Sequence, residues 1–165
     1  MEDCGSGILQ RLIAERGEHL ESTHAQHGDA TALLRPESLL EVMRFLRDDS
    51  ELAFNMLTDL TAVDWLDRAP RFEMVYHLYS LDWNHRLRVK AGVPDAPDAP
   101  AQVDSLCELW PSANWMEREV WDMYGIRFAG HPDLKRLLLY EEFEGHPLRK
   151  DYPKERRQPL VGPRN

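Results

Sequence analysis

The clearest pattern along the chain is a strict alternation of apolar and polar residues in two neighbouring segments, 71–79 and 86–93. A side-chain period of two is typical of strands with one buried and one solvated face. The polar residues 81–85 between the segments can form a turn. The pattern therefore predicts an antiparallel β-hairpin, and we expect the bases on its solvated face to pair with Glu73 across the strands.

Helical spacing of apolar residues occurs twice in the first fifty residues. Residues 8–16 show this spacing and are followed by Gly17, a residue type that often ends helices. A second helix is predicted over residues 36–48, which begin with a proline suited to a first helical turn. Between the two helices, residues 20–34 are predicted to form a β-hairpin that turns at Gly28.

The middle of the chain combines an apolar run with a proline-rich segment. Residues 52–60 are mostly apolar and are predicted to form a buried strand. Residues 61–65 follow as the end of this strand or as a turn. Asp64, beside Trp65, is either a catalytic acid near a ring or a carboxylate that fixes the turn, and we favour the turn. Three prolines in residues 94–100 exclude a regular element and predict a loop.

Two helical signals follow this loop. Ser105 and Glu108 have the spacing of a capping box that opens a helix, which Pro111 then interrupts. A longer helix is predicted over residues 113–124, ending at Gly125.

Two interactions are expected on the longer helix. Arg118 and Asp122 are four residues apart and are expected to pair on its surface. Its apolar face is predicted to comprise Trp115, Val120, Met123 and Tyr124.

Regular periodicity fades after Gly125. The tripeptide Gly-His-Pro occurs at 130–132 and again at 145–147, and each copy is expected to mark a sharp turn in an extended path, with Leu137–Leu139 and Phe143 docking on the body. The chain as a whole is predicted to be α+β, with a mixed, mainly antiparallel sheet covered by helices in residues 1–130. Residues 131–165 are predicted to form an extended C-terminal arm. Its part beyond residue 153 is basic, contains proline and cannot bury enough surface to fold alone.

Charge is distributed unevenly over the 165 residues, whose net value is -9. From Pro147 onward there are six bases and two acids, a balance of +4, which leaves -13 on the remainder. The acidic body argues against non-specific nucleic-acid binding, while the basic tail suits contact with this body or with another protein.

The remaining bulk features exclude several protein classes. No apolar run approaches the roughly 20 residues that span a bilayer, and the acidic N-terminus lacks the features of a secretory signal. Cys4 and Cys107 give neither a disulfide framework nor a metal-ligand spacing, which suits a reducing cytoplasm.

Familiar catalytic motifs are absent from the sequence: there is no glycine-rich phosphate loop, no G-x-S-x-G, no H-E-x-x-H and no C-x-x-C. Glu117 and Glu119 flank Arg118. This triplet is either a carboxylate base beside an arginine clamp for an anionic substrate, or a helix face on which the charges neutralise one another. His131 and His146 are either metal ligands or proton carriers, or they cap the backbone by hydrogen bonding. His19, His24 and His27 lie close in sequence, but no acid or cysteine completes a recognisable metal set, so we interpret them as solvated surface.

The segment from 117 to 153 resembles a known family. Glu117-Arg-Glu-x-x-Asp-Met-Tyr124, then His131, Lys135 and Leu137-Leu138, is similar to the signature of the C subunit of proton-pumping NADH:quinone oxidoreductase, the 30 kDa subunit family of respiratory complex I. The similarity continues through Gly130-His-Pro-Asp-Leu-Lys-Arg136 and Glu144-Gly-His-Pro-Leu-Arg-Lys-Asp-Tyr-Pro153 and covers about residues 52–157. The chain departs from many relatives at Leu139-Tyr140, where they carry a proline or threonine and an acid.

The resemblance implies a subunit without catalytic residues or cofactors of its own. NAD, FMN, iron–sulfur clusters and quinone would be bound by other subunits of the complex. The implied partner is the D subunit, whose fold houses much of the quinone cavity, in the peripheral arm on the cytoplasmic side of a bacterial inner membrane. No nucleic acid is implied, and membrane contact is made only through the complex. The equivalent subunit of a related membrane-bound dehydrogenase or hydrogenase is the first alternative, and a stand-alone hydrolase using Glu117 or Glu119 with His131 is the second.

By the same resemblance, the partner interface is expected to include residues of the helix and of the arm. These residues are Glu117, Arg118, Glu119, Asp122, Tyr124, Gly125, His131, Pro132, Lys135, Arg136, His146, Arg149, Lys150, Asp151 and Tyr152.

Overall fold

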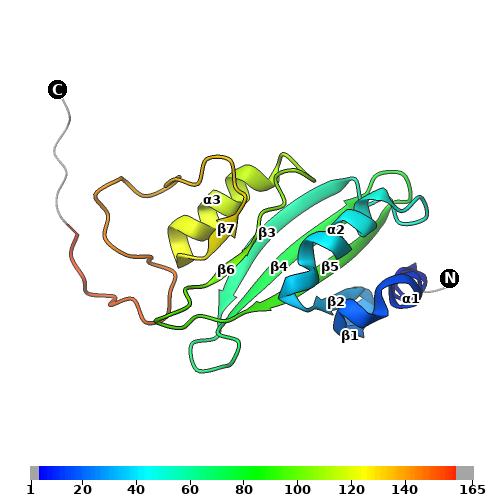
Figure 1. Ribbon diagram of the computed structural model, residues 1–165, viewed down its shortest axis with the longest axis horizontal. Helices are drawn as coiled ribbons and strands as arrows, with labels where there is room; N and C mark the ends of the chain where they lie inside the picture. Colours follow the sequence, from blue (N-terminus) through cyan, green and yellow to red (C-terminus); the bar gives the residue numbers. More distant parts are fainter. Residues whose placement is uncertain (1–3, 159–165) are drawn as a thin grey trace.

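A five-stranded sheet organises residues 4–158, which the computed structural model describes (Figure 1). The strands are β1 (Leu20–His24), β2 (Thr31–Leu34), β3 (Met56–Asp64), β4 (Phe72–Ser80) and β5 (His85–Val93). Their order is β1-β2-β5-β4-β3, and every neighbouring pair is antiparallel except β2 and β5, which run parallel. The predicted α+β class and the mixed, mainly antiparallel sheet are confirmed.

The hairpin predicted from the alternating pattern is formed by β4 and β5. Their pairing runs without a shift from Phe72 opposite Val93 to Ser80 opposite His85. On the solvated face Lys90 Nζ donates to a Glu73 carboxylate oxygen at 2.8 Å, as expected.

The N-terminal elements also follow the predictions. Helix α1 (Cys4–Arg16) continues into a 3₁₀ turn, η1 (Gly17–His19), so helical structure ends slightly later than the glycine suggested. Strands β1 and β2 form the predicted hairpin around a 3₁₀ turn, η2 (Gln26–Gly28). The 3₁₀ turn η3 (Pro36–Ser38) then leads into α2 (Leu39–Asp48).

The predicted start of the third strand was wrong. Leu52 and Phe54 are buried in the segment that precedes the strand, and residues 61–64 form the end of the strand, which was one of the two predicted alternatives for them. The reason is pairing: β3 bonds to β4 as far as Asp64 opposite Phe72, so the partner strand sets the limits and the local apolar run does not.

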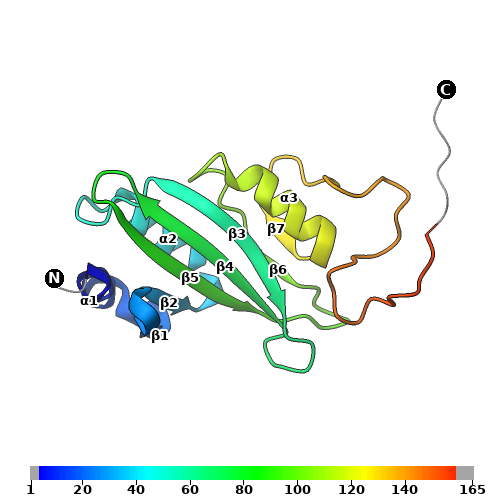
Figure 2. The same ribbon diagram turned by 180° about the vertical axis from the view of Figure 1, so that it is seen from behind.

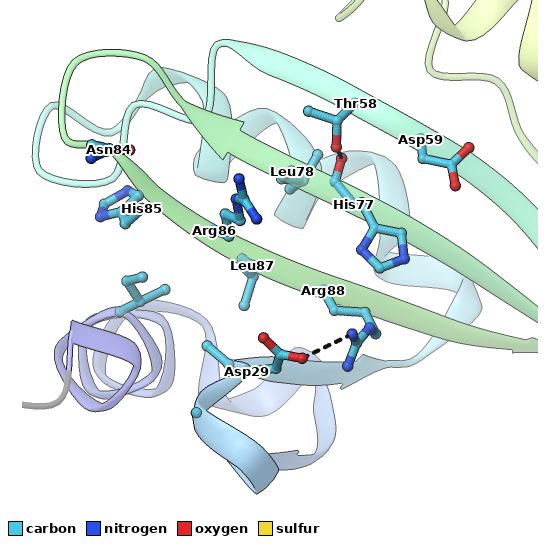
Figure 3. A pocket seen from close by; sticks show the side chains of 13 residues that line it. Asp29, Thr58, Asp59, His77, Leu78, Asn84, His85, Arg86, Leu87 and Arg88 are labelled. Atoms are coloured by element: carbon cyan, nitrogen blue, oxygen red, sulfur yellow. Dashed lines mark hydrogen bonds and ion pairs between the residues drawn. The ribbon is translucent and has the colours of Figure 1, made fainter.

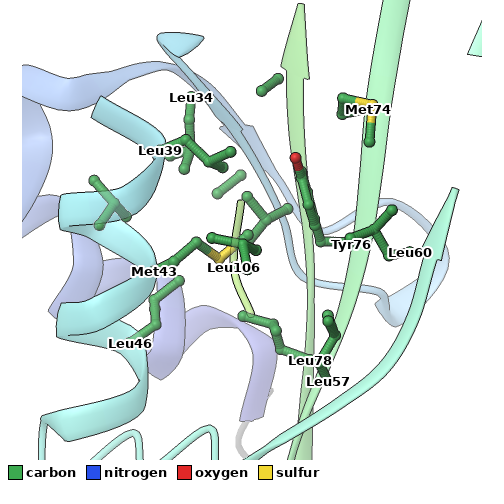
Figure 4. Close-up of a cluster of buried hydrophobic side chains, with 14 of the residues drawn as sticks. Leu34, Leu39, Met43, Leu46, Leu57, Leu60, Met74, Tyr76, Leu78 and Leu106 are labelled. Atoms are coloured by element: carbon green, nitrogen blue, oxygen red, sulfur yellow. The ribbon is translucent and has the colours of Figure 1, made fainter. Parts of the chain in front are cut away.

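The core lies between α2 and the buried face of the sheet (Figure 4). Met43 and Leu46 of α2 point toward Tyr76 and Leu78 of β4, and all four side chains are almost completely buried. Helix α2 is thus fixed by packing along one apolar stripe, the arrangement that its periodicity predicted.

A smaller layer follows in sequence and contains α3 (Ala113–Tyr124), which packs beside β3. Two short strands, β6 (Gln102–Asp104) and β7 (Arg127–Ala129), pair with each other in parallel. In the sequence β6 precedes α3 and β7 follows it, and neither strand was predicted. The helix predicted to start at Ser105 is not formed, since residues 105–112 are turns. The Ser105 hydroxyl instead donates to the buried carboxylate of Glu117.

Residues 130–158 contain no helix or strand and run around the C-terminal end of α3 (Figures 1 and 2). The Gly-His-Pro turns are present, with Gly130 at φ +81° and Gly145 at φ +95°. Residues 159–165 of the predicted basic arm lie outside the described residues. Among the described residues, no helix has the length and apolarity required to cross a membrane.

Candidate functional site

Helix α3 carries two carboxylates that are fully buried, Glu117 and Asp122. Glu117 accepts hydrogen bonds from the backbone N–H of Leu106 at 2.6 Å and from the Ser105 hydroxyl at 2.7 Å. Burial raises the pKa of Glu117, and these bonds only partly offset that effect. The carboxylate therefore fixes the turn that leads from β6 toward α3.

Asp122 fixes a different part of the chain. It accepts from Arg136 Nη1 at 2.7 Å and from three consecutive backbone N–H groups, those of Leu137, Leu138 and Leu139, at 2.8–3.1 Å. Burial alone would raise its pKa, but the hydrogen bonds outweigh this effect and the pKa is lowered. Asp122 is thus an ionised anchor for residues 136–139.

The predicted surface pair between Arg118 and Asp122 was wrong. Arg118 donates instead to the backbone carbonyls of Lys135 at 3.1 Å and Arg136 at 3.0 Å. Both side chains of the expected pair therefore hold the same segment of the chain, Arg118 through its carbonyls and Asp122 through its N–H groups.

The C-terminal segment caps the last turn of α3. The final four carbonyls of a helix have no partner within the helix. Here each of them accepts a hydrogen bond: Trp121 O from Gly125 N–H at 2.9 Å, Asp122 O from His146 Nδ1 at 2.9 Å, Met123 O from Leu148 N–H at 3.1 Å and Tyr124 O from Arg149 Nη1 at 3.2 Å. The interpretation of His146 as a backbone cap is confirmed.

A carboxylate at the end of β3 joins the same segment to the sheet. Asp64, almost fully buried, accepts two hydrogen bonds from Arg71 at 2.9 and 3.0 Å and one from the Lys150 N–H at 2.8 Å. It also accepts from the Leu66 N–H at 2.8 Å, which confirms that it fixes a turn. Burial by itself raises the pKa of Asp64, but these donors outweigh it and lower the pKa to about 2.

Arg71 and Arg149 extend this contact into a charge network. Arg71 donates to Asp151 at 2.8 Å, and Arg149 donates to Asp95 at 2.7 Å and to Asp151 at 3.2 Å. Asp95 comes from the proline-rich loop and Arg71 from the start of the hairpin, so the network joins three distant parts of the chain.

Sequence reasoning did not identify Arg71, Asp95 and Ser105 as members of this region. Asp64 was identified only as a turn anchor. Ser105 bonds Glu117 12 residues away, Asp95 bonds Arg149 54 residues away and Asp64 bonds Lys150 86 residues away. No local pattern relates positions that far apart.

The predicted interface residues differ strongly in exposure. Glu117 and Asp122 are buried, and eight others are half-buried. The exposed members are Glu119, Pro132, Lys135, Lys150 and Asp151.

Three apolar side chains of this region also face solvent. Trp115 is 64% exposed, so its assignment to the apolar face of α3 was wrong, and Leu138 and Leu148 are 63% and 51% exposed. The guanidinium of Arg118 lies 5.3 Å from the centroid of the Trp115 ring. Exposed large apolar groups among charged residues are typical of interaction surfaces.

His131 does not form a catalytic pair with either glutamate. Its Nε2–H donates to the Asn114 carbonyl at 3.1 Å, and its Nδ1 accepts from the Asp133 N–H at 3.0 Å. Both ring nitrogens therefore bond the backbone, as the capping interpretation predicted. The hydrolase alternative needs a free base, and His131 does not provide one here.

A concave surface lies on the solvated face of the sheet, away from α3 (Figure 3). This groove has a volume of about 840 Å³ and is open to solvent. Arg88 crosses it to bond Asp29 at 3.3 Å, and His77 and Arg86 lie along the same face. None of the predicted interface residues lines it.

Comparison with known proteins matches the region that contains both carboxylates of α3. Residues 32–158 match the family described as "Respiratory-chain NADH dehydrogenase, 30 Kd subunit". The C subunit of the NADH-quinone oxidoreductase of Rhodobacter capsulatus is 52% identical over 153 residues, which cover 93% of this chain and 73% of that protein. The corresponding protein of Roseiflexus castenholzii, also named as the C subunit, is 50% identical over 146 residues, covering 88% and 82%.

A solved structure shares the fold at low sequence identity. One chain in the structure of the membrane-bound sulfane sulfur reductase, an archaeal respiratory membrane complex, superposes with a TM-score of 0.76 at 21% identity, covering 92% of this chain and 86% of that one. The family match spans most of the chain and agrees with the close relatives. The chain therefore belongs to the family of the respiratory-chain NADH dehydrogenase 30 Kd subunit.

Proposed function

We propose that this chain is a structural subunit of the peripheral arm of NADH:quinone oxidoreductase, without catalytic residues of its own. In this role it supports electron transfer from NADH to quinone coupled to proton translocation. The names of relatives at about 50% identity support this reading over a related dehydrogenase or hydrogenase.

The main support for this proposal is what the side chains of the family signature bind. Glu117, Arg118, Asp122, Arg136 and His146 all bond backbone groups of this chain. A catalytic site needs a nucleophile or base whose reactive atom is free to meet a substrate. These residues instead fix the backbone beneath one surface. A structural subunit needs such a fixed surface to bind its partners.

The contact surface in this proposal is formed by the exposed side chains that the anchored backbone presents. It contains Trp115 and Leu138, with Glu119 and Lys135 as charged neighbours. The buried Glu117 and Asp122 contribute indirectly, because they hold the segments that carry these groups. Apolar anchors surrounded by charge are the usual composition of a specific interface.

The C-terminal segment supplies the second part of the proposed contact. Residues 131–165 act as an arm that contacts partner subunits, with Lys150 and Tyr152 among the contacts. Lys150 is exposed while its backbone is held by Asp64. Residues 147–158 of this segment carry five bases and two acids, and a basic stretch on an otherwise acidic chain favours a partner surface with acidic groups.

The D subunit of the same complex is the proposed direct partner. NAD, FMN, iron–sulfur clusters and quinone belong to other subunits in this proposal. The chain is then a peripheral protein on the cytoplasmic side of the inner membrane, attached through the complex.

The test is co-purification of the tagged full chain from detergent-solubilised membranes, followed by identification of the recovered chains and assay of NADH:quinone reduction. We expect recovery in a complex with flavin, iron–sulfur and quinone-reducing subunits. Trp115→Ser should lower this recovery, because Trp115 is exposed and its loss removes an interface anchor without opening a cavity.

The matched control is Trp83→Ser. Trp83 is 56% exposed in the turn between β4 and β5, at the other end of the molecule from the C-terminal segment (Figures 1 and 2). Equal recovery of the two variants would contradict the proposed interface. Recovery of the wild-type chain only as a lone monomer would contradict the proposed function.

A further inference from the structure

Three metal-binding side chains meet beside the N-terminal half of α3. They are Cys107 from the turn after β6, Glu117 from α3 and His131 from the turn after β7. One ligand atom of each lies within 4.8 Å of the others. The three residues are 10 and 14 positions apart in the sequence, so no metal-ligand spacing indicated them.

The geometry is close to that of a zinc site. Bonds of about 2.0–2.3 Å in a tetrahedral zinc centre place neighbouring ligand atoms roughly 3.3–3.7 Å apart. Cys107 Sγ already lies 3.5 Å from Glu117 Oε2. The ring nitrogen of His131 must approach by up to about 1.5 Å to complete three ligand positions.

The charge balance also suits a cation. Within residues 4–158, Glu117 forms no ion pair with an arginine or lysine, although it is fully buried. Its hydrogen-bond donors are the neutral Leu106 N–H, Ser105 hydroxyl and Cys107 thiol. Asp64 and Asp122, by contrast, each have an arginine partner. A buried carboxylate without a cationic partner is costly, and a bound divalent ion supplies the missing positive charge.

We propose that Cys107, Glu117 and His131 form a binding site for a divalent cation of the zinc type, with water in the fourth position. Thiolate, imidazole and carboxylate together select zinc over magnesium or calcium, which prefer oxygen ligands. Binding converts the Cys107 thiol to a thiolate and releases its proton to solvent. Cys107 and His131 are only half-buried, so an ion can enter from solvent.

The present hydrogen bonds of His131 define what binding must change. A metal on Nδ1 occupies the lone pair that now accepts the Asp133 N–H. A metal on Nε2 moves the ring proton to Nδ1, which then no longer accepts. Either mode breaks the Asp133 bond, so the amide resonance of Asp133 reports on occupancy.

The test uses the purified, reduced and metal-free full chain, titrated with Co²⁺ alone and then with Zn²⁺ alone. We expect one Co²⁺ per chain, thiolate-to-cobalt charge-transfer absorption in the near ultraviolet, and its loss when Zn²⁺ displaces the cobalt. The Asp133 amide should shift during the same titration. No partner protein is needed, so the outcome is independent of the proposed function.

Two substitutions have matched controls in the same sequence. Cys107→Ser should abolish the charge-transfer band, and both it and His131→Gln should weaken Zn²⁺ binding by at least about tenfold. Cys4→Ser and His27→Gln, which leave the three ligands intact, should bind as the wild type does. Folding of each variant is checked by circular dichroism.

Two outcomes overturn the proposal. One is the absence of charge-transfer absorption in the folded wild-type chain, a result that needs no variant. The other is a band that persists in Cys107→Ser, since the thiolate would then come from elsewhere.

Discussion

Asp122 accepts hydrogen bonds from one arginine and from three consecutive backbone N–H groups, and all four donors lie outside α3. A carboxylate with this many donors organises the chain around it in the way that a bound anion would. Its negative charge strengthens each of these hydrogen bonds. Because the site is buried, each backbone N–H group would lack a partner if the carboxylate were removed.

Replacing Asp122 should be among the most damaging changes to this chain. Asp122→Ala leaves Arg136 and three N–H groups without their acceptor, and removal of one member of a buried pair costs about 3–5 kcal/mol. The free energy of unfolding in urea measures this loss. Glu119→Ala, on the exposed face of the same helix, should change stability by less than about 0.5 kcal/mol. Similar losses for the two variants would refute the anchoring role.

Asp64 gives a second prediction, in acid. Its folded pKa of about 2 lies below the value near 3.8 expected when unfolded, so its contribution is complete above pH 4 and is lost as pH falls toward 2. The shift corresponds to about 2 kcal/mol. The stability difference between wild type and Asp64→Asn should therefore shrink by about this amount between pH 5 and pH 2. A difference that is constant with pH would contradict the assignment.

Individual side chains show where sequence reasoning stops. The spacing of Arg118 and Asp122 correctly places them near each other on a helix, yet each bonds residues 135–139 instead. A helical template describes only neighbours on the helix surface, and the competing partners come from a segment with no periodicity. The site residues of α3 and of the C-terminal segment could thus be named from the family signature, but Arg71, Asp95 and Ser105 and the pairing of all these residues could not.

Helix α3 ends where Gly125 adopts φ +80° and His146 packs against its α-carbon. A β-carbon at this position would lie 2.7 Å from His146 Cδ2, closer than van der Waals contact permits. The left-handed backbone and the close approach are separate demands for glycine, and the second one ties the end of the helix to the C-terminal segment.

Two glycine substitutions separate these demands. Gly130 also has a positive φ, +81°, but a β-carbon there would meet nothing within 4 Å. Gly130→Ala should therefore cost only the backbone strain of about 1–2 kcal/mol. Gly125→Ala should cost about 1–3 kcal/mol more, because His146 must move. Chemical denaturation of both variants tests this, and equal costs would show that the His146 contact contributes nothing.

The success of prediction also varied from element to element. The β4–β5 hairpin was predicted well because its strands are local in sequence and have one solvated face, so the alternation is visible. Strands β6 and β7 were missed because each has only three residues and its partner lies across α3. The Ser105 capping signal failed because a buried carboxylate recruited the hydroxyl.

At the scale of the molecule, the C-terminal segment joins α3, the proline-rich loop and the hairpin. Truncation after Glu144 removes Arg149 and Asp151 from the charge network and three caps from the end of α3. With each net hydrogen bond contributing about 1 kcal/mol, the loss in unfolding free energy should be on the order of 3–5 kcal/mol.

A variant with a shorter deletion serves as the control. Ending the chain after Gln158 keeps every contact described above, including the ion pair between Arg156 and Glu144, and should cost much less stability than ending it after Glu144. Urea denaturation followed by tryptophan fluorescence compares the two forms. If both are as stable as the full chain, the segment is not part of the folded unit.

The docking of this segment also has a consequence for biosynthesis. Asp64 and the Lys150 N–H that bonds it are 86 residues apart, and residue 150 leaves the ribosome long after the five strands have emerged. Until then Asp64 lacks one of its donors, Asp95 lacks Arg149, and the last carbonyls of α3 are uncapped. Chains that stop before residue 146 thus lack the contacts that close the end of α3 onto the sheet, so this part of the fold can be completed only after nearly the whole chain has been synthesised.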